Sequence, residues 1–467
     1  MPYHTLISSV LSISAVTLFT IASKSVFAAK TTRSLCQSVF NRPGRDEPLA
    51  AKNLRILPDL NVDSIHDYSD DFQMAPDTSV VVRSGYNIGT VVLNTRSGIQ
   101  AVIARKGLQP HSSVLSSSGT LLAVGYDRRN LVELFIVNQI SGAQKVSEFS
   151  WRSQNQSPKE EIRDLAISPD ENLIAGVSYH GEGAIYNRRT GEIVPINIET
   201  WSNGAAFSKN SQLLHLGTRT EKVLTLSAAT GELVNSVDYL EGFNQDCGAC
   251  IHTFDSGLVL ATTPTEAYLI KDGRRLSDLP QGLSRDLFSL DPLSNTAFVL
   301  YWERTGRLGK PVAEVRKIDP AFGRSHRLQK FTIPQSYVGY LRSSVISLGF
   351  QVVGLGLDGD AIVPGSPLYS RIADIHKLRT DDRGRVLLWD IETGRVFARL
   401  RSVQKGREDR TSALKMTINE ATGELVVAKG SGFAYSFNLN DVPRDRAVNL
   451  NDKQIPLLQA TRSTNGR

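Results

Sequence analysis

The sequence predicts an all-β protein: a single β-propeller of four-stranded antiparallel blades, with eight blades favoured and seven as the alternative. Short runs rich in β-branched and aromatic residues recur along the chain, at a spacing of about 40 to 50 residues. Their apolar residues alternate with a period of two, and most units end in a polar turn that contains glycine. Repetition on this scale is typical of sheets that pack radially around an axis.

The clearest unit runs from Arg383 to Leu400. Val386–Trp389 contains strong β-formers, and Glu392-Thr393-Gly394 supplies a turn in which the glycine can adopt a positive φ. Val396 and Phe397 then begin a return strand. This segment therefore predicts a β-hairpin.

Equivalent hairpins predict the remaining blades. A single blade cannot bury both of its faces, so neighbouring blades must stack and the ring must close. We expect closure to pair an early strand, near Ser64–Gln73, with the last blade. The expected hairpin turns lie near residues 97, 141, 190, 230, 272, 321, 393 and 440.

The domain organisation follows from these units. Residues 1–28 read as a signal peptide, because an apolar run from Thr5 to Ala22 precedes Val26-Phe27-Ala28, a motif typical of a signal-peptidase site. A retained membrane anchor is the alternative. Residues 29–64 form an irregular leader, 65–441 the propeller and 442–467 a polar tail. We therefore expect the mature chain to be exported, periplasmic or secreted, with no integral membrane span after cleavage.

Charge is distributed unevenly. The net charge is +6, yet the segment from Glu303 to Arg410 holds 20 Lys and Arg against 12 Asp and Glu. The long loops of the sixth and seventh blades, Glu303–Pro311 and Asp358–Asp382, depart most from the repeat. Such departures indicate either a binding surface for an anionic partner or a merely solvated set of loops. The candidate binding residues are Arg304, Arg307, Lys310, Asp358, Asp360, Lys377 and Arg379.

The three cysteines do not form a disulfide framework. Cys247 and Cys250 form a CxxC motif that can close a disulfide in an oxidising compartment, although either could instead pair with Cys36. The surroundings read as a loop entering a strand, whereas a redox pair would be expected to begin a helix.

At Arg385–Gly394, Leu165–Asp170 and Lys222–Val234 the chain resembles the WD-repeat superfamily and its bacterial relatives, the YVTN and quinoprotein-amine-dehydrogenase-like propellers. The resemblance covers roughly residues 65–441. It implies a scaffold that presents loops on two faces around a central channel. Many such proteins bind other proteins, whereas others hold cofactors or are lyases or lactonases, so the fold does not select among these functions.

The sequence shows no catalytic constellation. It contains no nucleophile elbow, P-loop, dinucleotide fingerprint or HExxH motif. The seven histidines after residue 30 share no register, and the acidic residues around His66 are not spaced like a calcium loop. We therefore assign no catalytic residue, metal or cofactor.

The leading functional hypothesis is an exported binding or scaffold protein that engages a protein or an anionic polymer through the loops of the sixth and seventh blades. The lack of aromatic residues interleaved with the basic stretch argues against nucleic acid. The alternative is a periplasmic propeller enzyme or enzyme subunit, such as a quinoprotein-like dehydrogenase subunit, a lyase or a lactonase, with a site on the central axis. The oligomeric state does not follow from the sequence.

Overall fold

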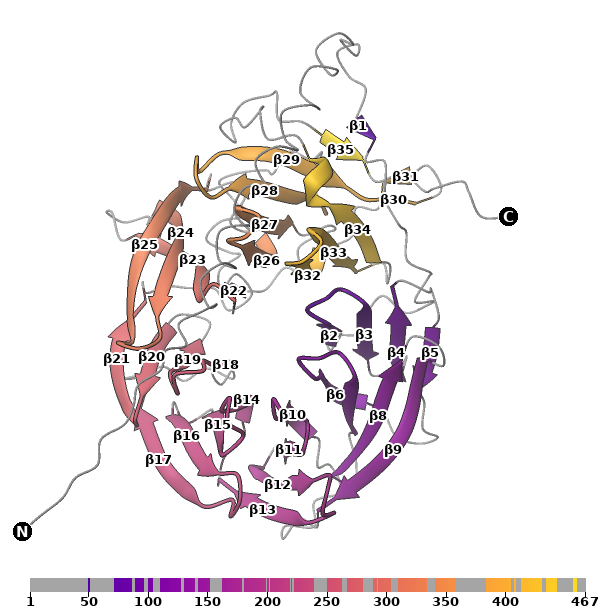
Figure 1. Cartoon of the computed structure of the whole chain (residues 1–467), viewed down its shortest axis with the longest axis vertical. Coiled ribbons are helices and arrows are strands. Elements are labelled where there is room, and N and C mark those ends of the chain that lie inside the picture. Colours follow the sequence, from indigo (N-terminus) through magenta and orange to yellow (C-terminus); the bar gives the residue numbers. More distant parts are fainter. Residues whose placement is uncertain are drawn as a thin grey trace, which may run out of the picture. The chain divides into compact units, whose positions relative to one another are not determined.

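The computed structural model forms eight sheets that follow one another around a common axis (Figure 1). It describes residues 49–50, 71–85, 89–95, 100–103, 110–126, 130–138, 142–151, 162–178, 180–198, 200, 202–218, 220, 222–238, 250–262, 267–279, 289–291, 293–303, 310–333, 341–357, 384–404, 407–408, 413–430, 434–442 and 457–459. The predicted fold class, an all-β propeller of eight blades, is confirmed.

Within each blade the strands follow chain order from the axis outward. Blades 1 to 4 contain β2 (Asp71–Met74), β3 (Val80–Gly85), β4 (Gly89–Asn94) and β5 (Gln100–Ile103); β6 (Pro110–Leu115), β7 (Leu121–Tyr126), β8 (Leu131–Asn138) and β9 (Gly142–Ser150); β10 (Ile162–Ile167), β11 (Leu173–Ser178), β12 (Glu182–Asn187) and β13 (Ile193–Asn197); and β14 (Ser202–Phe207), β15 (Leu213–Thr218), β16 (Lys222–Ser227) and β17 (Leu233–Asp238).

Blades 5 to 8 continue the pattern around the ring. They contain β18 (Cys250–Thr253), β19 (Val259–Thr262), β20 (Ala267–Lys271) and β21 (Arg274–Asp278); β22 (Ser289–Asp291), β23 (Thr296–Glu303), β24 (Lys310–Asp319) and β25 (Arg324–Thr332); β26 (Leu341–Ser347), β27 (Val352–Leu357), β28 (Val386–Asp390) and β29 (Val396–Arg401); and β32 (Ala413–Asn419), β33 (Glu424–Lys429) and β34 (Ala434–Asn438). The eighth sheet has three strands among the described residues.

The expected role of an early strand in closing the ring is wrong where it can be examined. Asp71–Gln73 lies in β2, which pairs with β3 as the innermost strand of blade 1. Residues 64–70 lie outside the described part. Among the described residues, two side-chain hydrogen bonds cross the closure: Thr78 Oγ1 donates to the Glu424 carboxylate at 2.7 Å, and Asn419 Nδ2 donates to the carbonyl of Asp77 at 2.7 Å.

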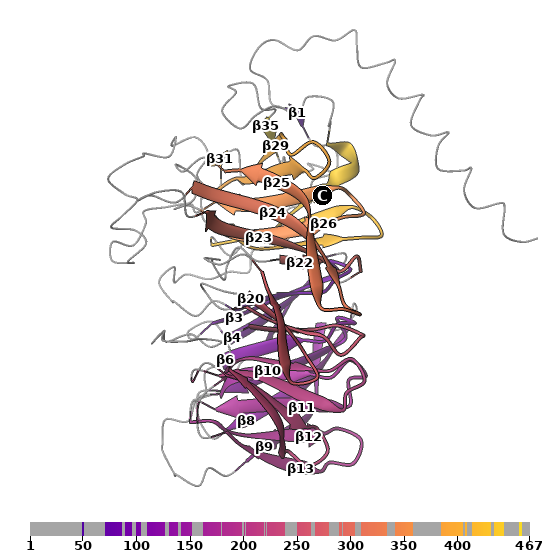
Figure 2. The ribbon, with the colours of Figure 1, turned by 90° about the vertical axis from the view of Figure 1, so that its left-hand side faces the viewer.

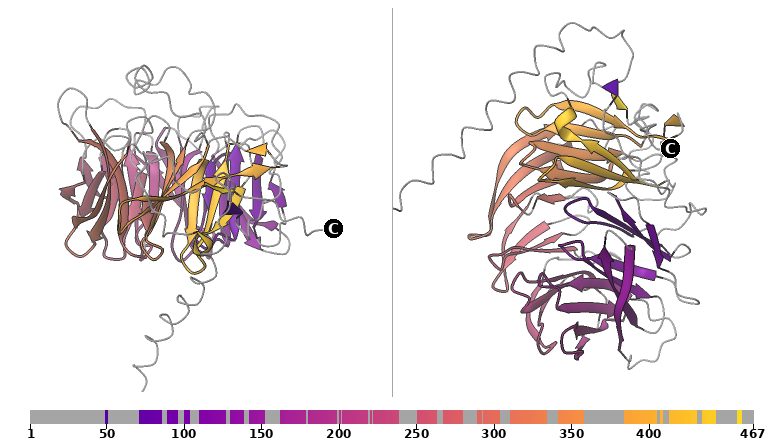
Figure 3. Two further views of the ribbon diagram at one scale, coloured as in Figure 1. Left: turned by 90° about the horizontal axis from the view of Figure 1, so that it is seen from above. Right: turned by 45° about the vertical axis from the view of Figure 1, so that its right-hand side comes forward.

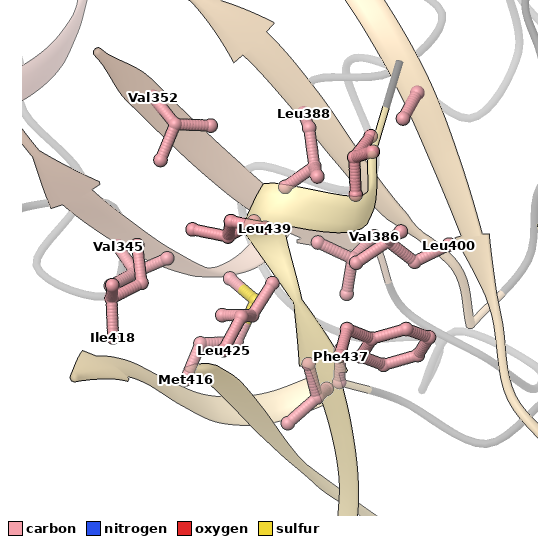
Figure 4. Packing of buried hydrophobic residues seen from close by; sticks show 14 of the residues in the cluster. Val345, Val352, Val386, Leu388, Leu400, Met416, Ile418, Leu425, Phe437 and Leu439 are labelled. Atoms are coloured by element: carbon pink, nitrogen blue, oxygen red, sulfur yellow. The ribbon is translucent and has the colours of Figure 1, made fainter. Parts of the chain in front are cut away.

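The core lies between successive blades. All six residues of β7 are buried, because both faces of the sheet are covered by neighbouring blades. Between blades 7 and 8, Met416, Phe437 and Leu439 pack against Val386 and Leu388 (Figure 4). A comparable cluster joins blade 8 to blade 1, so the apolar core follows the whole ring.

The strands run from one face of the ring to the other (Figure 3, left). Because each blade is a four-stranded meander, its first and third connections lie on one face, which we call the turn face. The second connection, together with the start of the innermost strand, lies on the opposite face, which we call the loop face. This assignment follows from the antiparallel pairing alone.

Five further elements among the described residues lie outside the blade pattern. The parallel strands β35 (Leu457–Gln459) and β1 (Leu49–Ala50) extend the sheet of blade 7 beyond β29. A short hairpin joins β30 (Val403–Gln404) to β31 (Arg407–Glu408), and η3 (Leu439–Asp441) follows β34. No helix among the described residues is long and apolar enough to cross a membrane.

Candidate functional site

The predicted binding residues belong to two connections that the fold places on the same face. In blade 6, Glu303 pairs with Lys310 where β23 and β24 reach the loop face. In blade 7, β27 and β28 reach the loop face at Leu357 and Val386, on either side of the longer connection. Figure 2 shows the strands of blade 6 beside β26 and β29 of blade 7. The two connections therefore begin and end on neighbouring blades.

The candidate binding residues themselves lie almost wholly outside the described part of the chain. Only the backbone of Lys310, the first residue of β24, is described. Arg304, Arg307, Asp358, Asp360, Lys377 and Arg379 are not described. Cys250 begins β18, as expected for a loop that enters a strand, whereas Cys247 lies outside the described residues, so their pairing stays a prediction.

The loop face carries a second feature, a bulge repeated at the start of the innermost strands. In blades 2, 3, 4, 7 and 8 the first and second strands shift register by one residue at the same place, which leaves one inner-strand residue without an opposing partner. A bulge of this kind bends the strand and redirects a side chain, and it is common beside functional sites. The five extra residues are His111, Arg163, Asn203, Arg342 and Leu414.

These bulges lie at the loop-face ends of the innermost strands. His111 and Arg163 are each half-buried there. The next residue in blade 3, Asp164, accepts a hydrogen bond from the backbone N–H of Leu165 at 3.0 Å. Its other carboxylate oxygen accepts from the hydroxyl of Ser202 in blade 4 at 3.4 Å. The carboxylate therefore helps to fix the inner strand directly after the bulge.

Two further inner-strand residues interact electrostatically across the ring. His252 lies on β18 of blade 5 and Lys415 on β32 of blade 8, where its side chain is exposed. Burial, and then the positive charge of Lys415, lower the pKa of His252 to about 4. The imidazole is therefore neutral at pH 7.

Three other described histidines, unlike His111 and His252, lie away from the innermost strands. His215 lies within β15, where its Nδ1 is 3.0 Å from the Thr225 hydroxyl and burial lowers its pKa to about 4. His326 lies on the outer strand β25, and His180 is exposed in a connection of blade 3. In the described part of the chain, no group of three or more His, Cys, Asp or Glu side chains is arranged to hold a metal ion.

The polar groups of the turn face, by contrast, bond to one another. The hydroxyl of Ser211 in blade 4 donates to Asp170 of blade 3 at 3.0 Å, and that of Ser347 in blade 7 donates to Glu420 of blade 8 at 2.8 Å. Hydrogen bonds hold the pKa of Asp170 at about 2, despite the opposing effect of partial burial. Burial raises the pKa of Glu420, and Asp291 adds to the rise. These side chains stabilise blade-to-blade contacts.

Comparison with known proteins supports the fold but does not identify a function. No protein-family model matches the chain, and no curated protein matches it either. Among solved structures, the computationally designed Ika8 protein matches with a TM-score of 0.53 and 13% identity, over 80% of this chain and 98% of that one. A chain in the crystal structure of the mitotic checkpoint complex matches at a TM-score of 0.46 and 12% identity, over 68% of this chain and 93% of that one, which is too distant to support an inference.

Sequence reasoning missed the bulge residues, although a signal for them exists. His111, Arg163 and Asn203 each stand five positions before a serine, at 116, 168 and 208, whose backbone begins the first turn of its blade. The spacing is constant, but the residue types differ, so a search for a repeated chemical motif does not find them. The propeller architecture that the resemblance to WD-repeat proteins implies is confirmed by the blades themselves, whereas kinship with the YVTN or quinoprotein-like branches stays a prediction.

Proposed function

We propose that the protein is an exported binding scaffold whose loop face engages a protein or anionic partner. The connections of blades 6 and 7 would make the outer part of the binding surface, and the inner-strand bulges would make its central part. The propeller fold supports the proposal, because it presents connections from many blades on one rigid face. The class of partner and the export of the chain are inferred from the sequence alone.

The observation that carries the proposal is the convergence of two independent features on one face. The repeat is interrupted most strongly at two connections that begin and end on the loop face of blades 6 and 7. The inner-strand bulges, found by backbone register alone, lie on that same face. The half-buried Arg163 and the exposed Lys415 add positive charge near the loop-face ends of β10 and β32, which favours an acidic partner group.

A charge-reversal experiment tests the outer part of this surface. Replacing Arg304, Arg307 and Lys310 together by glutamate should weaken retention on immobilised poly-glutamate and reduce photo-crosslinking to the partner in the exported fraction. Thermal unfolding of this variant and of the unchanged chain should be compared, so that lost retention through unfolding is told apart from lost binding. Unchanged crosslinking would count against this surface.

The chain offers a matched control on the opposite face. Arg189, Lys209 and Arg395 are exposed in turn-face connections of three different blades. Replacing these three by glutamate changes the net charge by the same amount, so it separates loss of a specific surface from loss of overall charge. Equal weakening by both triple variants would show that binding depends only on net charge and would contradict the proposal.

The central part can be tested separately through Arg163. Replacing it by methionine keeps much of the side-chain volume and removes the charge. If this part contributes, crosslinking should fall while the loop residues are intact. Full retention of partner binding would restrict the proposed site to the connections of blades 6 and 7.

A further inference from the structure

A second set of bulges repeats on the outermost strands, away from the loop face. In blades 2, 4, 5, 6 and 7 the third and fourth strands shift register by one residue, just after the hairpin turn. Unlike the inner bulges, these all contain an apolar residue. The extra residues are Val146, Val234, Leu276, Leu328 and Phe397.

These equivalent side chains differ sharply in exposure. Phe397 of blade 7 is 0% exposed and belongs to the cluster that contains Leu439 and Val442, contributed from beyond the last strand of blade 8. The other four are 42 to 59% exposed. A repeated large apolar residue at a bulge is thus covered in one blade and open to solvent in four.

Blade 7 also differs at its outer edge. Its outermost strand, β29, pairs in parallel with β35, so that Arg399, Leu400 and Arg401 face Leu457, Leu458 and Gln459. The pairing begins two residues after the bulge. The chain therefore contains its own example of a strand added to a blade edge next to a buried bulge residue.

Blade 6 has the corresponding features without such a cover among the described residues. Its outermost strand, β25, is the last strand of its sheet in that part of the chain, and Leu328 at its bulge is 42% exposed. Phe322, in the preceding turn, is 71% exposed. Leu276 of blade 5 is exposed as well, and its side chain lies beside Gly323, the residue that follows Phe322. We call these three exposed side chains, Leu276, Phe322 and Leu328, the apolar strip.

The charges beside this strip are mostly positive. Arg324, Arg327 and Lys330 are exposed on β25, and Arg274 and Arg275 are exposed on β21 of the neighbouring blade. The buried carboxylate of Glu314 bonds to Arg316 at 2.6 Å and to Arg327 at 3.4 Å, so it offsets part of the charge of Arg327. In blade 4 the equally exposed Leu233 and Val234 lie between Glu232 and Asp238 instead.

We propose that the outer edge of blade 6 is a docking site for an extended segment of a partner protein in which apolar residues alternate with Asp or Glu. The segment adds in parallel to β25, as β35 adds to β29. By the register of blade 7, it pairs with Lys330–Thr332 and its preceding residues pass Leu328 and Phe322. Its carboxylates meet the arginines of β25 and β21. This surface is separate from the loop face, so the inference does not depend on the proposed function.

The test uses labelled peptides of about ten residues, the length of a long strand, with valine and glutamate alternating. Fluorescence anisotropy should show binding of this peptide to the full chain, and no comparable binding of a valine–lysine peptide. Amide hydrogen exchange should slow in β25 when the glutamate peptide is present. Replacing Phe322 and Leu328 together by serine should weaken binding by about tenfold or more, which corresponds to about 1.4 kcal/mol.

A double variant of blade 4, Leu233→Ser with Val234→Ser, is the matched control, since it removes two exposed apolar side chains from another outer strand. It should leave peptide binding unchanged. Equal binding of the lysine peptide, or equal loss in both double variants, would overturn the proposal. Binding to phosphatidylglycerol vesicles that disappears in the Phe322/Leu328 variant, without peptide binding, would identify the strip as a membrane contact and would equally overturn it.

Discussion

The contrast between Phe397 and Leu328 gives a stability prediction that depends on the packing of blades 7 and 8. Both are the extra residue of an outer-strand bulge, but only Phe397 is fully buried, among Leu400, Phe437 and Leu439. Truncating a buried phenylalanine to alanine removes its transfer free energy and leaves a cavity, which costs about 3 to 5 kcal/mol. Leu328→Ala removes an exposed side chain and should change stability by no more than about 0.5 kcal/mol.

Urea unfolding followed by tryptophan fluorescence measures both effects, with the slope of the transition compared to confirm that the same surface unfolds. Phe397→Leu serves as an intermediate variant, because it keeps an apolar group and should cost about 1.5 kcal/mol or less. If Phe397→Ala and Leu328→Ala lowered stability equally, the burial of Phe397 against the segment that follows β34 would be refuted. The account of blade 7 as a covered edge would fail with it.

Three further predictions concern pH, ring closure and backbone geometry. Burial lowers the pKa of His215 from 6.5 to about 4, so the unfolded chain binds the proton more readily than the folded chain. Stability that is present above pH 6.5 should therefore be lost as the pH falls toward 4, by on the order of 3 kcal/mol. Replacing His215 by asparagine should flatten the pH dependence of the urea midpoint. A double-mutant cycle of Thr78→Ala and Glu424→Ala should yield a coupling free energy of about 1 kcal/mol across the ring closure, whereas additive effects would show that this hydrogen bond does not hold the ends together. Gly191 and Gly181 both have positive φ, but only at Gly181 would a Cβ meet backbone atoms, those of Thr200; Gly191→Ala should therefore cost about 1 to 2 kcal/mol in thermal unfolding and Gly181→Ala clearly more.

The blade pattern was predictable because it depends on local chemistry. Val386–Trp389 and Val396 form the expected hairpin strands, and Gly394 adopts a φ of 67° in the turn between them. Alternating apolar residues predict the strands, and glycines between them predict the turns. The same local signals recur along the chain, so the sequence favoured the observed eight blades over the alternative of seven.

Ring closure was not predictable from those signals. The strand near residue 71 has the composition of any inner strand, and only the pairing with β3 shows that it begins blade 1. Thr78 bonds to Glu424 and Asp77 to Asn419, although the partners of each pair stand more than three hundred residues apart in the chain. No local pattern encodes which ends of a closed ring become neighbours.

The candidate site was predictable only in part, for a related reason. The sequence identified the interrupted connections of blades 6 and 7, because an interruption is visible against a repeat. A bulge is not, because it changes register by one residue without changing composition, as His111 and Leu414 illustrate. Chemical identity varies at the position, and only the backbone is repeated.

The two kinds of bulge show how one repeated scaffold can support separate interactions. The inner bulges vary in chemistry from blade to blade, with His111, Arg163 and Leu414 at equivalent positions, so a ligand on the axis would meet a different group from each direction. The extra residue of each outer bulge is apolar, but its burial differs from blade to blade, as Phe397 and Leu328 show. Variation on the axis favours recognition of a single asymmetric partner group, whereas constancy at the rim favours the same strand-like contact in any blade whose charges permit it. Substitutions at Arg163 and at Leu328 should therefore affect different partners, and a loss of both interactions from either substitution alone would contradict this separation.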